Sequence, residues 1–219
     1  MADPRDVVIP LLRGRLHQHA LWLAAAAAAA LIALAPGERA RFAAGVYGAG
    51  LCVLFGMSAL YHRWPGPLRC KPILRRLDHS AIFVFIAASY TPVGLLVLSP
   101  PLGTILLAVA WAIALVGVAV SVAWIDAPRL LQAGCYLAAG WVAVVALPEL
   151  LRGAGLAPVV LFALGGAVYS LGAVVYAWRR PDPWPRVFGF HEVFHALVIA
   201  AALVHFVAMA GWIIPRGGV

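Results

Sequence analysis

The run GTILLAVAWAIALVGVAVSVA, from Gly103 to Ala123, contains 21 residues and no charged side chain. A helix of this length rises about 32 Å, and the hydrocarbon core of a bilayer is about 30 Å thick. The run is apolar throughout, without the alternation of apolar and polar residues that marks the strands of a membrane barrel. It therefore predicts a transmembrane α-helix.

Six further apolar runs flank this one, and each is a candidate span. In chain order, the seven runs are Ala20–Ala35, Phe42–His62, Ser80–Leu98, Gly103–Ala123, Leu130–Leu147, Leu156–Trp178 and His191–Ile213. Most reach the roughly 20 residues that a helix needs to cross a bilayer. Because the connections are short, we expect one membrane domain over residues 1–219, an all-α bundle of seven transmembrane helices.

The composition supports this interpretation and excludes a soluble domain. Hydrophobic residues make up 64% of the 219 and charged residues 11%, whereas soluble domains are about a quarter charged. The net charge of +8 does not indicate a nucleic-acid partner, because no basic stripe falls on a polar domain. We expect a multi-pass protein of the cell membrane (in a bacterium, the inner membrane) with membrane lipids as its partners. The sequence carries no signal for an oligomeric state.

The first run also resembles a cleavable signal peptide. It is short and rich in alanine, follows Arg13 and Arg15, and ends in Ala33-Leu34-Ala35. Its charged leader is long for a signal peptide, however, and further apolar runs follow at once. We therefore expect an uncleaved first span.

Lysine and arginine divide unequally between the two sides of the predicted bundle. Twelve of the sixteen fall in the N-terminal tail and in the loops after spans two, four and six, and four fall on the other side. Loops rich in lysine and arginine remain in the cytoplasm. This distribution predicts a cytoplasmic N-terminus and an extracytoplasmic C-terminus.

Three histidines lie at matching depths in the predicted bundle. His191 and His195 are four residues apart at the start of span seven, so both rings face one side of the helix. His62 closes span two, at the same cytoplasmic end. A single interfacial histidine usually caps a helix or meets lipid headgroups, but three imidazoles with one open position form the arrangement of a catalytic zinc site. The sequence therefore predicts zinc bound by His62, His191 and His195.

Two more polar residues fall at this depth. Asp78 opens span three, and Ser58 lies four residues before His62 on the same helix face. We expect Asp78 to support the ligands or to take a proton from the attacking water, and Ser58 to hydrogen-bond that water or a substrate carbonyl. The other histidines have different expected places: His17, His19 and His79 at the interface or behind the ligands, and His205, about 15 Å deeper than His195, between helices.

The segment His191-Glu192-Val193-Phe194-His195 also matches H-E-x-x-H, the motif of zinc proteases with the glutamate as base. Only three positions are fixed, so chance matches are common. The protease hypothesis also needs a third ligand, and His205 is too deep to supply it. An intramembrane metalloprotease is the least favoured of the catalytic hypotheses.

Over nearly its whole length the chain resembles the haemolysin III family, which belongs with the progestin and adiponectin receptor (PAQR) proteins in a wider group that includes alkaline ceramidases. The resemblance rests on six motifs in order: RGRLH (13–17), SALYH (58–62), LDHSAIF (77–83), SYTP (89–92), GFHEVFH (189–195) and LVHF (203–206). Family members often have Gly-Thr-Tyr-Thr-Pro where this chain has Ala88-Ser89-Tyr90-Thr91-Pro92, a change that does not affect the site.

This resemblance implies seven helices, an inside N-terminus and zinc held near the cytoplasmic face. Carried onto this sequence, the zinc ligands are His62, His191 and His195. Ser58 and Asp78 match the family's serine and its water-binding aspartate. The family tolerates different residues between the last two histidines, so the H-E-x-x-H match looks incidental.

Three functions follow as hypotheses. The leading one is a zinc-dependent hydrolase of a lipid amide or ester at the cytoplasmic membrane face, with the acyl chain in an apolar cavity between helices. The second is a non-enzymatic regulator of membrane state, in which zinc is a structural clamp between spans two, three and seven. A haemolysin-type lytic or pore-forming protein is suggested by the family name alone, because no span carries a charged stripe or polar face that would line water.

Overall fold

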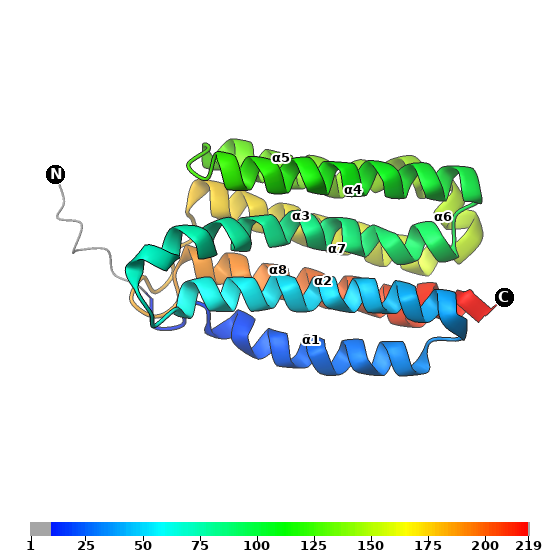
Figure 1. Cartoon of the computed structure of the whole chain (residues 1–219), viewed down its shortest axis with the longest axis horizontal. Helices are drawn as coiled ribbons and strands as arrows, with labels where there is room; N and C mark the ends of the chain where they lie inside the picture. Colours follow the sequence, from blue (N-terminus) through cyan, green and yellow to red (C-terminus); the bar gives the residue numbers. More distant parts are fainter. Residues whose placement is uncertain (1–9, 219) are drawn as a thin grey trace.

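Seven membrane-length helical segments run roughly antiparallel in a computed structural model that describes residues 10–218 (Figure 1). The helices are α1 (Arg15–Leu34), α2 (Gly37–Arg63), α3 (Lys71–Leu96), α4 (Pro100–Ala123), α5 (Arg129–Trp141), α6 (Leu147–Ala154), α7 (Leu156–Trp178) and α8 (Phe190–Ala208). Span five comprises α5, a 3-10 segment and α6, so the predicted count of seven is confirmed. The described residues contain no β-strand, only an isolated bridge between Trp184 and Phe188.

Small residues on one face of each outer helix explain how these helices pack. The buried residues of α1 are His17, Ala20, Ala24, Ala28 and Leu31, which recur every three or four positions and so form one stripe. A Cβ atom on Gly48 of α2 would lie only 2.5 Å from the Cβ of Ala28. Such close approach is how membrane helices gain packing energy without a hydrophobic driving force. The opposite faces of the outer helices expose large apolar side chains, as contact with lipid requires.

The spans close into a ring around an internal cavity. Successive spans are neighbours from α1 to α4, α5 packs against α7 and α7 against α8, and α8 returns to contact α1. The cavity has a volume of about 710 Å³ and is lined by residues from all eight helices. The bundle therefore has an interior as well as a lipid-facing surface.

The two ends of the bundle differ in their content of positively charged side chains. The connections between α2 and α3, between α4 and α5, and between α7 and α8 all lie at one end, together with the segment before α1 (Figure 1). This end, called the basic end below, carries most of the lysine and arginine of the described residues. The segregation that the sequence predicted is therefore present in the fold.

The predicted spans differ from the structure most in spans three and five. Span three was expected to begin at Ser80, but α3 begins at Lys71, so Asp78 lies in its second turn and not at its start. The prediction began the span where the apolar run begins. A helix can extend beyond the membrane through polar residues, so α3 starts earlier than its apolar run. Span five was expected to be one helix from Leu130 to Leu147, but α5 ends at Trp141, a 3-10 segment covers Val142–Ala146, and α6 continues to Ala154.

Tyr90 on α3 compensates for the break in span five. Its hydroxyl oxygen lies 2.6 Å from the carbonyl oxygen of Gly140 and 2.9 Å from that of Ala139, and it accepts a hydrogen bond of 3.0 Å from the backbone N–H of Ala143. Backbone groups freed inside a bilayer need such partners, since no bulk water is present. A side chain from another helix thus permits the change from α to 3-10 geometry.

The segment before α1 packs onto the connection that leads into α8. The backbone N–H groups of Leu11 and Leu12 donate to the carbonyls of Arg186 and Val187 at 3.0 and 3.2 Å. Gly14, the residue directly before α1, has a φ of 74°, a left-handed conformation that glycine adopts without strain. The first and last helices are therefore tied together at the basic end.

Candidate metal centre

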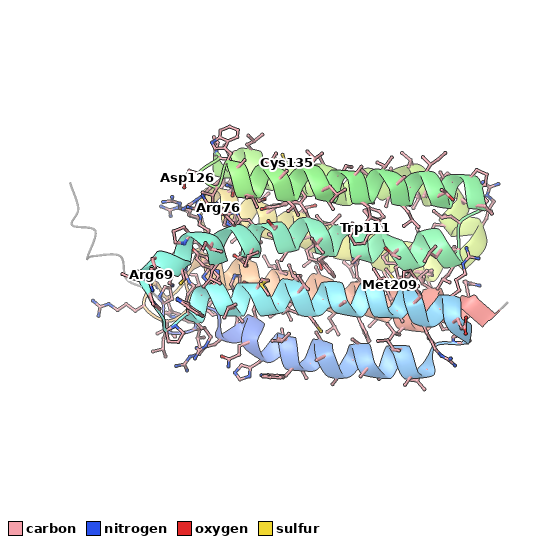
Figure 2. All side chains as sticks on the ribbon, viewed as in Figure 1. Arg69, Arg76, Trp111, Asp126, Cys135 and Met209 are labelled. Atoms are coloured by element: carbon pink, nitrogen blue, oxygen red, sulfur yellow. The ribbon has the colours of Figure 1, made fainter. Side chains whose placement is uncertain are left out.

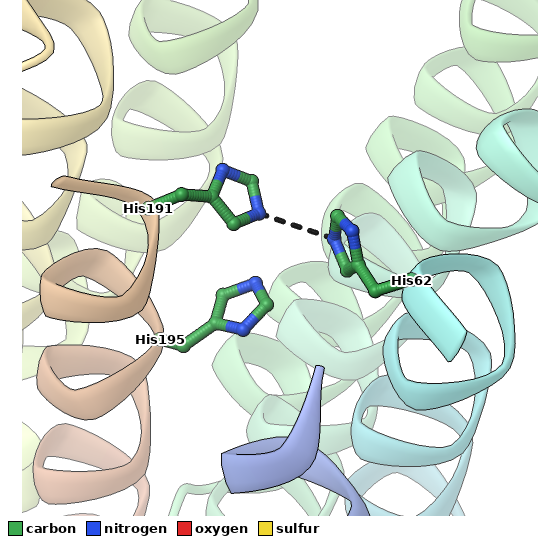
Figure 3. Close-up of side chains that lie close together, drawn as sticks. All are labelled: His62, His191 and His195. Atoms are coloured by element: carbon green, nitrogen blue, oxygen red, sulfur yellow. Dashed lines mark hydrogen bonds between the residues drawn. The ribbon is translucent and has the colours of Figure 1, made fainter. Parts of the chain in front are cut away.

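Three histidine rings converge at the basic end from two helices that are far apart in sequence (Figure 3). His62 belongs to the last turn of α2, and His191 and His195 to the first two turns of α8. The Nε2 atoms of His62 and His191 are 3.1 Å apart. One nitrogen from each of the three rings lies within 4.8 Å of the other two. Ligand nitrogens of a tetrahedral zinc site are about 3.3 Å apart, so the three histidines are placed to hold a metal ion.

Local sequence accounts for the placement of the two histidines on α8. This helix begins at Phe190, directly after Gly189, and the spacing of four residues stacks His191 and His195 on one face. On α2, the helix continues through His62 to Arg63, so the His62 ring projects from the last turn toward α8. Both placements follow from ordinary helix geometry.

His195 is the most enclosed of the three rings. It is 2% exposed, and its Nδ1 atom has no hydrogen-bond partner among residues 10–218. An unpaired buried nitrogen carries a desolvation cost, which a bound metal ion or a further hydrogen bond would offset. The donor chemistry of the cluster fits zinc, since imidazole suits this metal and needs no thiolate.

His17 packs directly against this ring. The His17 and His195 rings are stacked with centroids 3.8 Å apart and planes inclined by 12°. His17 is 3% exposed, and neither of its ring nitrogens has a partner within the described part of the chain. It therefore lies behind a candidate ligand, one of the places expected from the sequence, and fixes the orientation of that ring.

Asp78 and Ser58 face the same cluster. The Oδ2 atom of Asp78 lies 3.9 Å from Nε2 of His62, a distance that permits electrostatic interaction but is too long for a direct hydrogen bond. Ser58 is buried on α2 and its side chain neighbours the Asp78 carboxyl group. A third helix, α3, thus brings a carboxylate to the three histidines.

Glu192 belongs to a different set of contacts. Its Oε1 atom accepts a hydrogen bond of 2.5 Å from Nε of Arg13, and its Oε2 atom accepts one of 3.0 Å from the backbone N–H of Gly189. The side chain is fully buried. Both oxygens are therefore engaged in capping α8 and in holding the segment before α1, and Glu192 does not line the cavity.

The remaining histidines occupy separate places. His79 is half-buried on α3 and lines the cavity, while His19 is exposed on α1. His205 donates from Nε2 to the carbonyl of Phe162 on α7 at 3.2 Å, which confirms the expected polar contact between helices. A Cβ on Gly165 would lie 2.2 Å from Cδ2 of His205, so glycine at this position makes room for the ring.

The cavity connects the histidine cluster to the deep part of the bundle. His62, Asp78 and His191 line it at the basic end, and Phe162, His205 and Met209 line it further along α7 and α8. Most of the surface between these ends is apolar, with side chains such as Ile82, Phe85 and Val198. The cavity can therefore accept an apolar chain with a polar group near the histidines.

Several neighbours of the site could not be singled out from the sequence. The stack of His17 on His195 depends on how α1 meets α8. Tyr61 and Tyr176 contact the rings of His62 and His191, with centroid distances of 4.6 and 6.2 Å. The adjacency of Tyr61 to His62 is the only sequence signal for these contacts.

Comparisons with known proteins agree over most of the chain. A family model described as "Haemolysin-III related" matches residues 6–206. Among curated proteins, "Hemolysin-3" of Bacillus cereus is 32% identical over 175 residues, which cover 78% of this chain and 74% of that protein. "Hemolysin-3 homolog" of Bacillus subtilis (strain 168) is 34% identical over 164 residues, 74% of this chain and 72% of the relative. "Monocyte to macrophage differentiation factor" of Homo sapiens is 28% identical over 178 residues, 77% and 69% of the two chains.

Proposed function

Because the chain belongs to the haemolysin-III-related family of multi-pass membrane proteins, we propose that its histidine cluster binds zinc and hydrolyses a lipid amide or ester. The observation that carries the proposal is the convergence of three histidines and the Asp78 carboxylate at one end of a largely apolar cavity. That end is the basic end, which the charge distribution predicts to face the cytoplasm. The cavity would place the acyl chain between helices and its polar linkage beside the histidines.

Each residue at this end has a defined role in the proposed reaction. His62, His191 and His195 hold the metal, and the stack with His17 keeps the His195 ring in place. When bound, zinc lowers the pKa of a coordinated water toward about 7 and polarises a carbonyl. Asp78 accepts the proton of the attacking water and returns it to the departing amine or alcohol as the acyl carbon–nitrogen or carbon–oxygen bond breaks. Ser58 donates a hydrogen bond to the Asp78 carboxylate or to the substrate carbonyl.

Two substitutions test the proposal. Asp78→Asn should abolish release of fatty acid while zinc remains bound, because the amide keeps the shape of the carboxylate and loses its basicity. His191→Ala should lose most of the zinc, which should be about one ion per chain in the wild type. The assays are fatty-acid release from defined ceramides and phospholipids in detergent, and metal content by mass spectrometry.

Asp126→Asn is the matched control. This carboxylate also lies at the basic end but is exposed, pairs with Arg75 and does not itself line the cavity. It should retain both zinc and activity. Full zinc retention in His191→Ala would refute the metal site, and activity in Asp78→Asn would refute the role of this carboxylate.

The same geometry favours one alternative, a structural clamp without turnover. The candidate ligands join α2 to α8, and His195 stacks on α1, so a metal ion would fasten the ends of three helices. In this case a chelator would lower the temperature of thermal unfolding, because metal binding would contribute directly to stability. Wild-type protein would release no fatty acid from any lipid, and Asp78→Asn would change stability alone.

A further inference from the structure

Four cationic side chains line the cavity at the basic end: Arg13, Lys71, Arg75 and Arg129. Asp78 is the only acidic residue among the described residues that line it. Lys71, Arg75 and Asp78 are spaced by four and three residues along α3 and therefore share one helix face. The mouth of the cavity thus has an excess of positive charge directly beside the histidine cluster.

Two of these cations are already paired. Arg13 contacts Glu192 at 2.5 Å, and Arg75 contacts Asp126 at 2.8 Å. Lys71 and Arg129 have no carboxylate oxygen within 4.0 Å among residues 10–218. Within the described part of the chain, these two side chains, here called the cationic rim, are the cavity-lining cations without a carboxylate partner.

One side of the cationic rim is Lys71 at the start of α3. Its Nζ atom donates to the carbonyl of Tyr61 at 3.3 Å and lies 5.5 Å from the centre of the Tyr61 ring. That ring is 4.6 Å from the ring of His62. A single aromatic side chain therefore separates Lys71 from a candidate metal ligand.

The other side is Arg129, the first residue of α5. Its Cζ atom lies 5.9 Å from the centre of the Tyr176 ring, which in turn is 6.2 Å from the ring of His191. Each tyrosine face holds its cation near the cavity by a cation–π contact. The rim therefore approaches the histidine cluster from two helices, with a tyrosine on each side.

An orientation signal alone does not explain this arrangement. Positive charges collect at the cytoplasmic end of most membrane proteins, and Arg69 and Arg76 lie at the same end of this bundle (Figure 2). Neither of these two arginines lines the cavity. Lys71 and Arg129 do, so their charge acts on whatever occupies the cavity mouth.

We propose that the cationic rim binds the phosphate group of an anionic lipid whose acyl chain lies in the cavity. A phosphate offers several charged oxygens to donors on different sides, which suits a lysine and an arginine on two helices. The phosphate would lie at the cavity mouth, next to the histidines. The alcohol part of an acyl ester, which leaves when the ester bond breaks, would lie on the same side. This inference rests on the proposed function for the position of the acyl linkage, and it makes phospholipids, and not uncharged ceramides, the substrate class.

A binding measurement tests the rim without requiring turnover. Full-length Asp78→Asn protein in neutral detergent is titrated with dioctanoyl phosphatidic acid and with dioctanoylglycerol, which has the same chains and no phosphate. We expect phosphatidic acid to bind at least about tenfold more tightly, since hydrogen bonds between charged groups contribute that much. Lys71→Gln and Arg129→Gln should each lose about tenfold in affinity for phosphatidic acid and bind dioctanoylglycerol as before.

Arg69→Gln is the matched control, because it removes one charge from the same end but not from the cavity. It should bind both lipids as the parent does. Lys71→Arg keeps the charge and should preserve the preference, which separates lost charge from a folding defect. Equal affinity for the two lipids, or an equal loss in Arg69→Gln, would overturn the proposal.

Competition identifies the source of the phosphate. Millimolar inorganic phosphate should not displace the lipid, and displacement by it would overturn a lipid site in favour of free phosphate. The outcome also separates this inference from the hydrolase. Tight binding of phosphatidic acid, without hydrolysis by the wild-type protein, would support phosphate binding by the cationic rim and refute the proposed hydrolase activity. Lipid hydrolysis by the wild-type protein, without tighter binding of phosphatidic acid than of dioctanoylglycerol, would refute only the phosphate-binding role of the cationic rim.

Discussion

Glu192 illustrates how a residue inside a familiar motif can serve another purpose. It lies between His191 and His195 in sequence, yet one of its oxygens contacts Arg13 and the other accepts from the N–H of Gly189. On a helix, the residue after His191 points about 100° away from it. The helical spacing that unites the two histidines therefore turns Glu192 toward the segment before α1.

Glu192→Gln should lower the free energy of unfolding by about 2–3 kcal/mol, because it leaves the Arg13 guanidinium without its carboxylate. This is below the roughly 3–5 kcal/mol of a fully buried pair, since the Arg13 side chain remains 24% exposed. Activity per zinc-loaded molecule should change little. Chemical unfolding in detergent, zinc content and fatty-acid release measure the three quantities.

The double variant Arg13→Gln with Glu192→Gln is the control for this prediction. Removing both charges should recover part of the stability, because no uncompensated charge remains. The protease hypothesis requires the reverse pattern, with activity abolished and stability kept. That pattern would show that Glu192 acts as the base.

At the level of elements, the fifth span is the least regular. Its change from α5 to the 3-10 segment is compensated by the Tyr90 hydroxyl, a group supplied by α3. Tyr136 of α5 makes a comparable but longer contact, 3.5 Å, with the carbonyl oxygen of His79 on α3. The shape of span five therefore depends on α3.

Tyr90→Phe should destabilise the protein by about 1–3 kcal/mol, because it removes a partner from buried backbone groups. The loss should be local, with faster amide exchange at residues 139–146 than elsewhere in the bundle. Hydrogen-exchange mass spectrometry in detergent measures it. Tyr169→Phe is the matched control, since the hydroxyl of Tyr169 has no partner among residues 10–218. Equal exchange in the two variants would contradict the role of the Tyr90 hydroxyl.

Hydropathy could predict that each span exists but not where each helix ends. The lipid core demands about 20 apolar residues, and all seven runs are found as spans. Lys71 to Leu77 are helical because the chain continues to pair its backbone outside the apolar layer, and hydropathy does not report that pairing. The break after Trp141 was not predictable, since the residue that compensates for it lies about 50 positions earlier.

At the scale of the whole molecule, the orientation in the membrane can be tested directly. A reporter enzyme that is active only outside the cytoplasm should be active when fused after Val219. It should be inactive when inserted among residues 69–76, because twelve of the sixteen lysines and arginines are predicted to lie on the inner side. Activity at the second position but not at the first would invert the predicted topology and place the histidine cluster at the outer face.

Sequence spacing predicted the cluster with Asp78 and Ser58 beside it, but not all of its surroundings. His191 and His195 follow from the helical repeat, and His62 from the antiparallel order of the spans. The stack of His17 on His195 depends on how α1 meets α8. The chain just before α1 also comes close to α2, since a Cβ on Gly14 would lie 2.7 Å from the Cβ of His62. Contacts of this kind are set by the packing of distant segments, which a single sequence does not specify.

The two halves of the histidine cluster are separated by 129 residues, from His62 to His191. A chain being synthesised at the membrane delivers α2 well before α8, so His62 is inserted before its partners exist. A polypeptide interrupted between α2 and α8 would carry only one of the three histidines and an unclosed ring of helices. Synthesis of α8 is therefore the event that brings the three histidines together, and products that stop short of α8 are left without the cluster.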